Sequence, residues 1–428
     1  MSSPAGNCLA RALHIILRIA FALTAFAWAI PAQAQNFQVI STLPNEWFAS
    51  QLTTDQSGNL YGVTATSGED RDREICEDGC GAVFELYQYN SQWVLITLYN
   101  FLGVADGFNP QGQLTFGPDG SLYGTTMYGG FWGFGTVYRV TPLCEIVCNG
   151  WLPWKHTVLY DFKQGNCNTG CDGQYPSTPV AFDHARNLYG VTEYGGFGNN
   201  GQSWGMLFRL SPRSLRGKKW GETQLHVFGK THSDGTLPQG AVLMDKAGNL
   251  YGTTLWGGDN NFGTVYELLD NDNEYSEVVL HSFTYSDGAY PQSGLVVDSS
   301  GNLYGATFGG ASGGTVFELS PAGNHSWTYK VLYNFQPGEA SSLKNLAIDG
   351  AGNLYGVGYT GGALDLGTIY RLTLKENGWV YTSLHDFTGD LDGEHPESLY
   401  LDSRGNLYGS AHCNTSCESS LIWMIRPN

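Results

Sequence analysis

The amino-acid sequence predicts an all-β protein, a seven-bladed β-propeller with four antiparallel strands in each blade. Three observations predict this fold: the composition, a repeat present in seven copies, and a strand that is spare at one end of the repeats and missing at the other. Glycine supplies 58 of the 428 residues and aromatic residues 14%, while charged residues make up only 14%. Glycine destabilises helices by roughly 1 kcal/mol per position relative to alanine, whereas turns favour it. The chain is also 42% hydrophobic, which excludes a disordered protein.

The repeat is recognised by the tripeptide Leu-Tyr-Gly. Asp-x-x-Gly-Asn precedes most copies, and a Gly-Gly pair and then Gly-Thr-Val-[Phe/Tyr] follow them. The first six copies each continue to an aromatic residue and, eight positions later, a phenylalanine. The tyrosines of the seven copies are Tyr61, Tyr123, Tyr189, Tyr251, Tyr304, Tyr355 and Tyr408. Repetition of one unit at this spacing is typical of propellers and other repeat folds.

Each unit contains four expected strands, which the fifth copy shows clearly. They are residues 294–297, 302–307, 314–319 and 327–335. The Asp-x-x-Gly segment between the first two strands suits a tight hairpin, because the Asp side chain accepts hydrogen bonds from backbone N–H groups and Gly adopts positive φ. Four short strands repeated around an axis are the blades of a propeller.

The seventh unit has only three expected strands, and the fourth is missing. Residues 39–43, ahead of the first unit, read Val-Ile-Ser-Thr-Leu and align with the fourth strand of the fifth unit at residues 331–335. We therefore expect residues 37–43 to lie beside residues 420–426, completing the last blade and covering its edge. The expected blades are 44–103, 104–164, 165–229, 230–284, 285–336, 337–388, and 389–428 with 37–43.

Residues 1–34 have the pattern of a signal peptide. A basic segment at residues 11–18 precedes an apolar stretch at residues 19–30, and Ala32-Gln33-Ala34 is a typical cleavage site. The apolar stretch is too short to span a bilayer. We expect a secreted or periplasmic protein of bacterial type, in which residues 35–428 form one monomeric propeller without a membrane span.

Eight cysteines follow the leader, in four Cys-x3-Cys pairs. The pairs are Cys76/Cys80, Cys144/Cys148, Cys167/Cys171 and Cys413/Cys417. Paired cysteines in an exported protein indicate disulfides. We expect bridges within each pair, although the spacing also permits cross-pairing between the second and third pairs. The pairs lack the spacing of a zinc site, and we expect neither a metal ion nor a cofactor.

The charge of the chain excludes nucleic acid as a partner. With 21 basic and 39 acidic residues, the net charge is −18 at pH 7. Nucleic-acid binding depends on clustered Lys and Arg, and so does attraction to anionic membranes.

The combined motif resembles the GloVer tandem-repeat family of exported bacterial proteins. The resemblance rests on Asp-x-x-Gly-Asn-Leu-Tyr-Gly with the Gly-Gly pair and Gly-Thr-Val-Phe-Glu-Leu, and it covers the chain beyond the leader. The hairpin motif alone is more weakly similar to NHL and gluconolactonase-like propellers. The family resemblance implies a propeller-type repeat and no established catalytic activity.

Five aspartates occupy equivalent positions in the loops between successive blades, each in the motif Asp-Gly-x-x-Pro. They are Asp106, Asp172, Asp234, Asp287 and Asp392. These loops converge on one channel mouth, so one interpretation is an acidic rim that binds a cation or a hydroxyl-rich ligand. The alternative is turn chemistry, in which each Asp caps its own loop and Pro starts the next strand.

A second set of candidates lies just before the Gly-Gly pairs. These aromatic residues are Tyr128, Tyr194, Trp256 and Phe308, and the series is broken by Thr360 beside Tyr359. Trp132 lies in a longer loop of the same kind. Aromatic residues beside glycines can stack on sugar faces, or they can fill the gaps between blades.

No catalytic residue is predicted. The chain contains no Gly-x-Ser-x-Gly, His-Glu-x-x-His, P-loop or dinucleotide motif. His226, His281 and His385 lie two positions before the repeat phenylalanine, where other copies have Tyr, and are therefore interpreted as structural. His232, His395 and His412 break the repeat pattern and are weak candidates for a site.

We therefore expect a binding scaffold for glycans or proteins at one channel mouth, with catalysis undecided but less expected. The alternative is a polysaccharide hydrolase or lyase that uses carboxylates from different blades. A purely structural surface component is a third possibility.

Overall fold

The computed structural model describes residues 37–44, 47–66, 76, 79–143, 154–163, 172–196, 204–212, 220–272, 274–310, 313–323, 326–413 and 419–426. Their regular structure is entirely β, and the predicted leader lies outside them. None of the described elements is a helix with the length and apolarity that crossing a bilayer requires.

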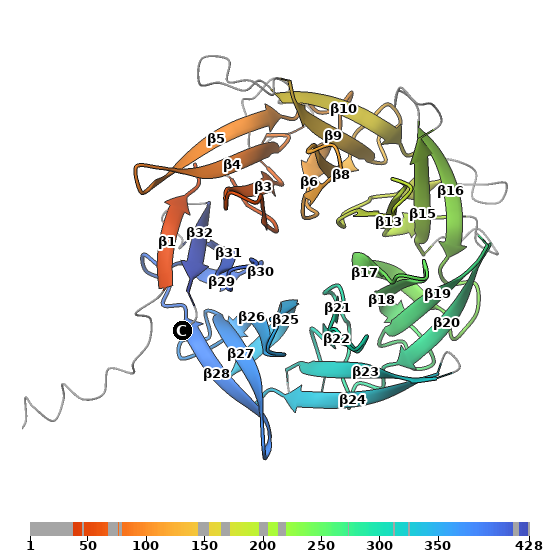
Figure 1. The fold of residues 1–428 in the computed structure, drawn as a ribbon, viewed down its shortest axis with the longest axis vertical. Helices are drawn as coiled ribbons and strands as arrows, with labels where there is room; N and C mark the ends of the chain where they lie inside the picture. Colours follow the sequence, from red (N-terminus) through yellow and green to blue (C-terminus); the bar gives the residue numbers. More distant parts are fainter. Residues whose placement is uncertain are drawn as a thin grey trace, which may run out of the picture. The chain divides into compact units, whose positions relative to one another are not determined.

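Seven antiparallel sheets follow one another around a ring, as Figure 1 shows, and this confirms the predicted propeller. Blade 1 consists of β2 (Thr53–Thr54), β3 (Leu60–Thr64), β4 (Ala82–Tyr89) and β5 (Gln92–Asn100). Blade 2 consists of β6 (Phe108–Pro110), β7 (Thr115–Phe116), β8 (Leu122–Tyr128), β9 (Thr136–Pro142) and β10 (Trp154–Asp161). Blade 3 consists of β12 (Ala181–Phe182), β13 (Leu188–Thr192), β15 (Met206–Pro212) and β16 (Trp220–Val227), beside the small pair β11 (Gly173–Gln174) and β14 (Tyr194–Gly195).

The remaining blades repeat the same order from the inner to the outer strand. Blade 4 consists of β17 (Gly235–Met244), β18 (Leu250–Gly257), β19 (Thr264–Asn271) and β20 (Glu274–Ser282). Blade 5 consists of β21 (Val296–Val297), β22 (Leu303–Ala306), β23 (Thr315–Gly323) and β24 (Ser326–Asn334). Blade 6 consists of β25 (Ala340–Ile348), β26 (Leu354–Gly361), β27 (Thr368–Lys375) and β28 (Gly378–Asp386). Blade 7 consists of β29 (Glu394–Pro396), β30 (Tyr400–Leu401), β31 (Leu407–His412), β32 (Ser420–Ile425) and β1 (Phe37–Thr42).

The N-terminal strand β1 completes the last blade, as predicted. It pairs antiparallel with β32, with Phe37 opposite Ile425 and Thr42 opposite Leu421, and the two strands lie side by side in Figure 1. The backbone N–H of Leu43 continues the ladder to the carbonyl oxygen of Ser420 at 2.9 Å. The first and last parts of the described chain therefore close the ring by hydrogen bonds.

The Leu-Tyr-Gly repeat builds the blade core through all three of its residues. In blade 1, Leu60 is fully buried, and the Tyr61 hydroxyl donates to Asp55 of the Asp-x-x-Gly turn at 3.3 Å. Gly62 lies opposite Phe84 on the next strand, where a Cβ atom would come within 2.6 Å of the Phe84 ring. Glycine is therefore required for the aromatic residue of the third strand to lie flat over the sheet.

The predicted Asp-x-x-Gly hairpin is also observed. In blade 4, Asp245 Oδ1 accepts the N–H of Asn249 at 2.9 Å, and Gly248 has a φ of 93°.

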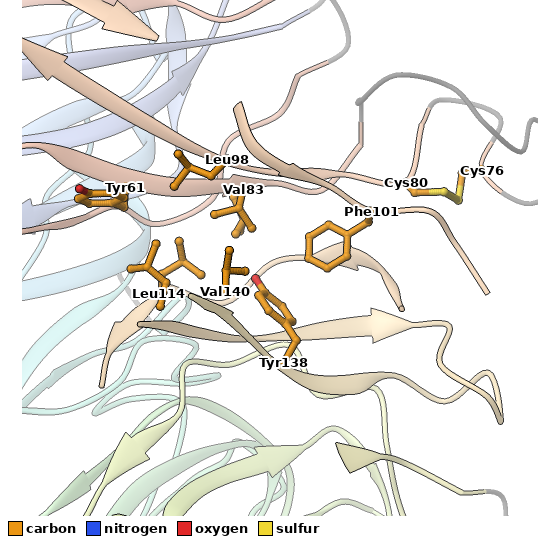
Figure 2. Close-up of a cluster of buried hydrophobic side chains, with 11 residues drawn as sticks. Tyr61, Cys76, Cys80, Val83, Leu98, Phe101, Leu114, Tyr138 and Val140 are labelled. Atoms are coloured by element: carbon orange, nitrogen blue, oxygen red, sulfur yellow. A yellow bond between two sulfur atoms is a disulfide. The ribbon is translucent and has the colours of Figure 1, made fainter. Parts of the chain in front are cut away.

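The phenylalanine that closes each repeat packs between blades. Phe101 of blade 1 meets the Tyr138 ring of blade 2 edge-on, with centroids 5.0 Å apart, and Figure 2 shows the two rings facing each other within their hydrophobic cluster. Such aromatic pairs add roughly 0.5–1.5 kcal/mol beyond the area that they bury. The core of the propeller is thus a series of clusters between neighbouring blades.

The disulfide expected between Cys76 and Cys80 is present, with an S–S distance of 2.10 Å, and it lies at the edge of the cluster in Figure 2. Cys413 is also disulfide-bonded. Cys144, Cys148, Cys167, Cys171 and Cys417 lie outside the described residues.

Candidate functional site at the channel mouth

Residues from all seven blades line a single hollow of about 450 Å³, which places it at the axis of the ring. One lining residue from each blade, in order, is Gln51, Gln111, Ser177, Gln239, Gln292, Lys344 and Glu397. Five of these follow the proline of the loop motif or its equivalent at the start of an inner strand. The lining therefore contains mainly amide and hydroxyl side chains, with Glu193, Lys344 and Glu397 as its charged residues.

The loops that reach this mouth share an unusual backbone feature just before the proline. Tyr175 has a φ of 59°, and its N–H donates to the carbonyl oxygen of Phe134 in the preceding blade at 3.0 Å. A side chain in this left-handed region costs roughly 1–2 kcal/mol. The equivalent residues with positive φ and a backbone hydrogen bond to the preceding blade are Asn109, Leu237, Tyr290, Ser342 and His395. The strained conformation thus recurs at six of the seven interfaces between neighbouring blades.

A charged cluster breaks the sevenfold repeat at blades 6 and 7. Glu397 contacts Lys344 Nζ at 3.3 Å and His412 Nε2 at 3.3 Å. Burial alone would raise the pKa of Glu397, but the hydrogen bond from His412 and the charge of Lys344 outweigh burial and hold that pKa below its ordinary value. Glu397 is therefore ionised at neutral pH and its charge is matched by Lys344.

Rings surround this cluster. Lys344 Nζ lies 5.1 Å from the centre of the Tyr359 ring, which is within cation–π range. His395 stacks on Tyr359 with centroids 4.6 Å apart, and its Nδ1 lies 2.9 Å from the Tyr359 carbonyl oxygen. Phe48, which also lines the hollow, lies 5.8 Å from the His412 ring. Two of the histidines that break the repeat, His395 and His412, thus come together here.

His232, the third such histidine, is exposed in the loop before β17.

The five loop aspartates bind to their own loops and strands. Asp172 accepts a hydrogen bond from the Tyr160 hydroxyl at 2.7 Å and one from the Lys163 N–H at 3.2 Å. Asp106 does the same with Tyr99 and the N–H of Leu102. In the other three loops, His takes the place of Tyr, in the pairs His226–Asp234, His281–Asp287 and His385–Asp392. These contacts account for each Asp as a loop cap, and none of the five is among the residues that line the hollow.

The pKa shifts of three loop acids differ with the residue that each is paired with. Burial raises the pKa of Asp106 and of Asp172. Burial also acts to raise the pKa of Asp392, but its hydrogen bonds with His385 and Thr388 outweigh this effect and the pKa is lowered. At Asp392 the histidine therefore favours the ionised carboxylate, whereas the tyrosines beside Asp106 and Asp172 do not outweigh burial.

A sixth loop acid, Glu339, was missed because its loop lacks Asp-Gly. It accepts the Tyr333 hydroxyl at 2.8 Å and the N–H of Gln336 at 2.9 Å. Its position relative to Tyr333 equals that of Asp287 relative to His281. Because this spacing differs among the other loops, no constant signal in the sequence marked Glu339.

Three of the aromatic candidates lie at strand ends, in β8, β14 and β18, and form two separate groups. Tyr128 and Tyr194 both contact Tyr175, with centroids 5.2 Å and 5.9 Å apart. Trp256 instead contacts Tyr290 at 4.5 Å. Tyr194 and Trp256 are 38% and 37% exposed, so each has one face against a neighbour and another in solvent.

Sequence reasoning missed Tyr175 and Tyr290, although both precede the loop proline. Phe308 is half-buried, with its N–H bonded to the Tyr290 carbonyl oxygen, and Trp132 is exposed beside Phe131.

Comparison with solved structures supports the fold alone. Virginiamycin B lyase from Staphylococcus aureus is 11% identical, with a TM-score of 0.55, over 91% of this chain and 99% of that chain. The extracellular domain of a putative one-component system from B. thetaiotaomicron is 12% identical, with a TM-score of 0.54, over 92% of this chain and 40% of that chain.

No curated protein matches the chain. The sequence profile of the Gloeobacter/Verrucomicrobia repeat matches residues 155–345. The match lies within the propeller and spans parts of blades 2 to 6. Those residues therefore carry the Gloeobacter/Verrucomicrobia repeat, in agreement with the resemblance inferred from the motifs.

Proposed function

We propose that this chain is an exported binding protein that recognises a neutral, hydroxyl-rich ligand, a glycan, at the channel mouth. The observation that carries the proposal is the axial hollow of about 450 Å³ lined by Gln111, Gln239 and Gln292. Amide side chains both donate and accept hydrogen bonds, as sugar hydroxyl groups require. A hollow of this size holds a small ligand or the end of a chain.

The electrostatics disfavour an anionic ligand. Lys344 and Glu397 neutralise each other at the wall of the hollow, and Glu193 adds a second carboxylate, which accepts the Ser177 hydroxyl at 2.7 Å. Phe48 is 38% exposed at the same hollow and offers an apolar face on which a sugar ring can stack. Tyr194 in β14 and Trp256 in β18 extend the surface available to a longer glycan.

A glycan array followed by calorimetric titration of each hit tests the proposal. We expect Gln239→Ala, Gln292→Ala and Phe48→Ala each to weaken binding at least fivefold, because each removes a hydrogen bond or the stacking face. Tyr89→Ala is the matched control, since Tyr89 is an exposed aromatic residue at the turn between β4 and β5. Unchanged affinity in all three mouth variants would refute the proposal.

Trp256→Ala and Tyr194→Ala form a second series. If the ligand reaches these two residues, these variants weaken the binding of long oligosaccharides and leave that of short ones unchanged. If these two variants no longer bind short oligosaccharides while the three mouth variants bind them as wild type does, the binding site lies at Trp256 and Tyr194 and not in the hollow.

The contact between His412 and Glu397 favours a second candidate function, a polysaccharide lyase or hydrolase. An imidazole oriented by an ionised carboxylate is a typical general base. In that case Glu397→Gln would abolish the release of new sugar ends from a polysaccharide panel, whereas a binding protein would release none before or after the substitution.

A further inference from the structure

Six of the seven interfaces between neighbouring blades repeat a contact of three residues near the outer rim. The first is the Tyr or His two positions before the repeat phenylalanine, and the second is the loop acid that it contacts. The third comes from the outer strand of the next blade. At four interfaces this third residue is a ring stacked on the first: His156 on Tyr99, Tyr329 on His281, Tyr381 on Tyr333 and Phe37 on His385.

The interface between blades 3 and 4 differs because it combines a histidine as the first residue with a carboxyl group, Glu277, as the third. The interface between blades 2 and 3 also has a carboxyl group there, Glu222, but its first residue is Tyr160. Glu277 pairs with Leu268 across the sheet, just as Tyr329 pairs with Leu319, so Glu277 and Tyr329 occupy the same structural position. A carboxylate therefore faces the imidazole where a ring would otherwise stack. His226 Nε2 lies 3.4 Å from Glu277 Oε2 and 3.6 Å from Asp234 Oδ1.

The three groups are buried and only partly satisfied by hydrogen bonds. The side chains of His226, Asp234 and Glu277 are 12%, 2% and 14% exposed. Asp234 Oδ2 accepts the N–H of Lys230 at 3.0 Å, whereas Asp234 Oδ1 is buried, points into the cluster and has no hydrogen-bond partner among the described residues. His226 Nε2 and Glu277 Oε1 are also buried, and they too have no hydrogen-bond partner among the described residues. Buried polar atoms left in this way carry a desolvation cost that a ligand would remove.

The geometry matches the first shell of a small divalent ion. One ligand atom from each residue lies within 4.8 Å of the other two. Ligands at about 2.0–2.2 Å from Zn²⁺ in a tetrahedral arrangement lie roughly 3.3–3.6 Å from one another, close to the two distances that involve His226. One imidazole with two carboxylates suits Zn²⁺ or Mn²⁺ better than Ca²⁺, which prefers an all-oxygen shell.

We propose that His226, Asp234 and Glu277 bind one divalent transition-metal ion, which joins blade 3 to blade 4. His226 comes from β16, Glu277 from β20, and Asp234 from the loop that connects the two blades. This departs from the sequence-based expectation of no metal site. Each of the three residues occupies a repeat position, and only the fold brings them together.

Zinc titration of the oxidised, EDTA-treated protein by calorimetry tests the proposal, with Mn²⁺ as a second probe. Two variants restore residues that other interfaces already use. His226→Tyr reproduces the Tyr160–Asp172 pair, and Glu277→Tyr reproduces the stack of Tyr329 on His281. His281→Tyr is the matched control, because that interface has His and Asp without a third carboxylate.

We expect the wild-type protein to bind one ion per chain, His226→Tyr and Glu277→Tyr to weaken that binding at least 100-fold, and His281→Tyr to leave it unchanged. Circular dichroism verifies the fold of each variant. Anomalous diffraction at the zinc edge from wild-type crystals gives an independent readout, with a peak expected among the three side chains. Saturable binding that persists in both variants, an anomalous peak elsewhere, or no saturable binding of either ion would overturn the proposal.

Discussion

The imidazole of His156 lies flat against the phenol ring of Tyr99, with ring centroids 4.4 Å apart and planes within 10° of parallel. The two residues belong to neighbouring blades, so this stack is part of the interface between blades 1 and 2. His156 Nε2 is buried without a hydrogen-bond partner among the described residues, and burial lowers the pKa of His156 to about 4. The stacked imidazole is therefore neutral at neutral pH.

We expect His156→Phe to reduce the acid sensitivity of the protein. The pKa of this histidine falls from 6.5 in the unfolded chain to about 4 in the folded one, so between these values the unfolded state binds more protons. Stability present above pH 6.5 is thus lost as the pH falls toward 4. Wild type should lose up to about 3 kcal/mol more than the variant over this window. Urea unfolding at a series of pH values measures the difference.

The exposed His184→Asn is the control for this series, and it should follow the wild-type curve. A His156→Phe curve parallel to that of wild type would show that His156 does not titrate on unfolding.

Glu222 occupies the outer-strand position in blade 3 that His156 occupies in blade 2. The dependence of stability on pH that Glu222 causes should have the opposite sign. Burial, and then the nearby Asp172 carboxylate, raise the pKa of Glu222 from 4.5 to about 7. The folded state therefore binds more protons between these values, and its stability falls as the pH rises from 4.5 to 7. Glu222→Gln should remove about 1–2 kcal/mol of that loss, allowing for solvent screening. Urea midpoints at pH 5 and pH 7.5 suffice for the test.

Glu274→Gln, at an exposed position of β20, serves as the comparison for Glu222→Gln. If both variants show the same change between the two pH values, the raised pKa of Glu222 is excluded as the cause.

The fold could be predicted because the same structural requirements recur in all seven blades. Each blade has a glycine equivalent to Gly62 beneath an aromatic side chain and a turn equivalent to the one at Asp55, so the repeated pattern cannot be a chance match. The closing strand could be predicted for the same reason, since residues 39–43 fill a gap in an otherwise regular count. Repetition is a strong signal for architecture.

The channel mouth was not predicted, although glutamine occupies four of its seven equivalent lining positions. Ser177, Lys344 and Glu397 take the other three, and glutamine after a proline matches no recognised binding motif. The loop aspartates, by contrast, were singled out because they repeat. They repeat because each caps an equivalent loop, and repetition at a constant position indicates a structural task more than a binding site.

The hydroxyl groups of Tyr138 and Tyr370 are fully buried and have no hydrogen-bond partner among the described residues. Phe84 and Phe317 occupy the same position in other blades. We expect Tyr138→Phe and Tyr370→Phe each to stabilise the protein by about 1 kcal/mol, because they remove an unsatisfied polar group without changing the ring. Urea unfolding of each variant measures the gain.

Tyr266→Phe provides the comparison, since its hydroxyl is not among the unsatisfied groups. A loss of stability in Tyr138→Phe and Tyr370→Phe would show that each buried hydroxyl has a partner, such as an ordered water.

Phe37 should contribute most of the energy that closes the ring. Its ring stacks on His385 with centroids 3.7 Å apart and also contacts Phe387 and Trp423, so it joins β1 to both blade 6 and blade 7. Because Phe37 is half-buried, Phe37→Ala should cost about 1–3 kcal/mol. Gln38→Ala, at the exposed next position of β1, should cost less than about 0.5 kcal/mol. Equal urea midpoints for the two variants would show that backbone pairing of β1 with β32, and not the Phe37 side chain, holds the ring closed.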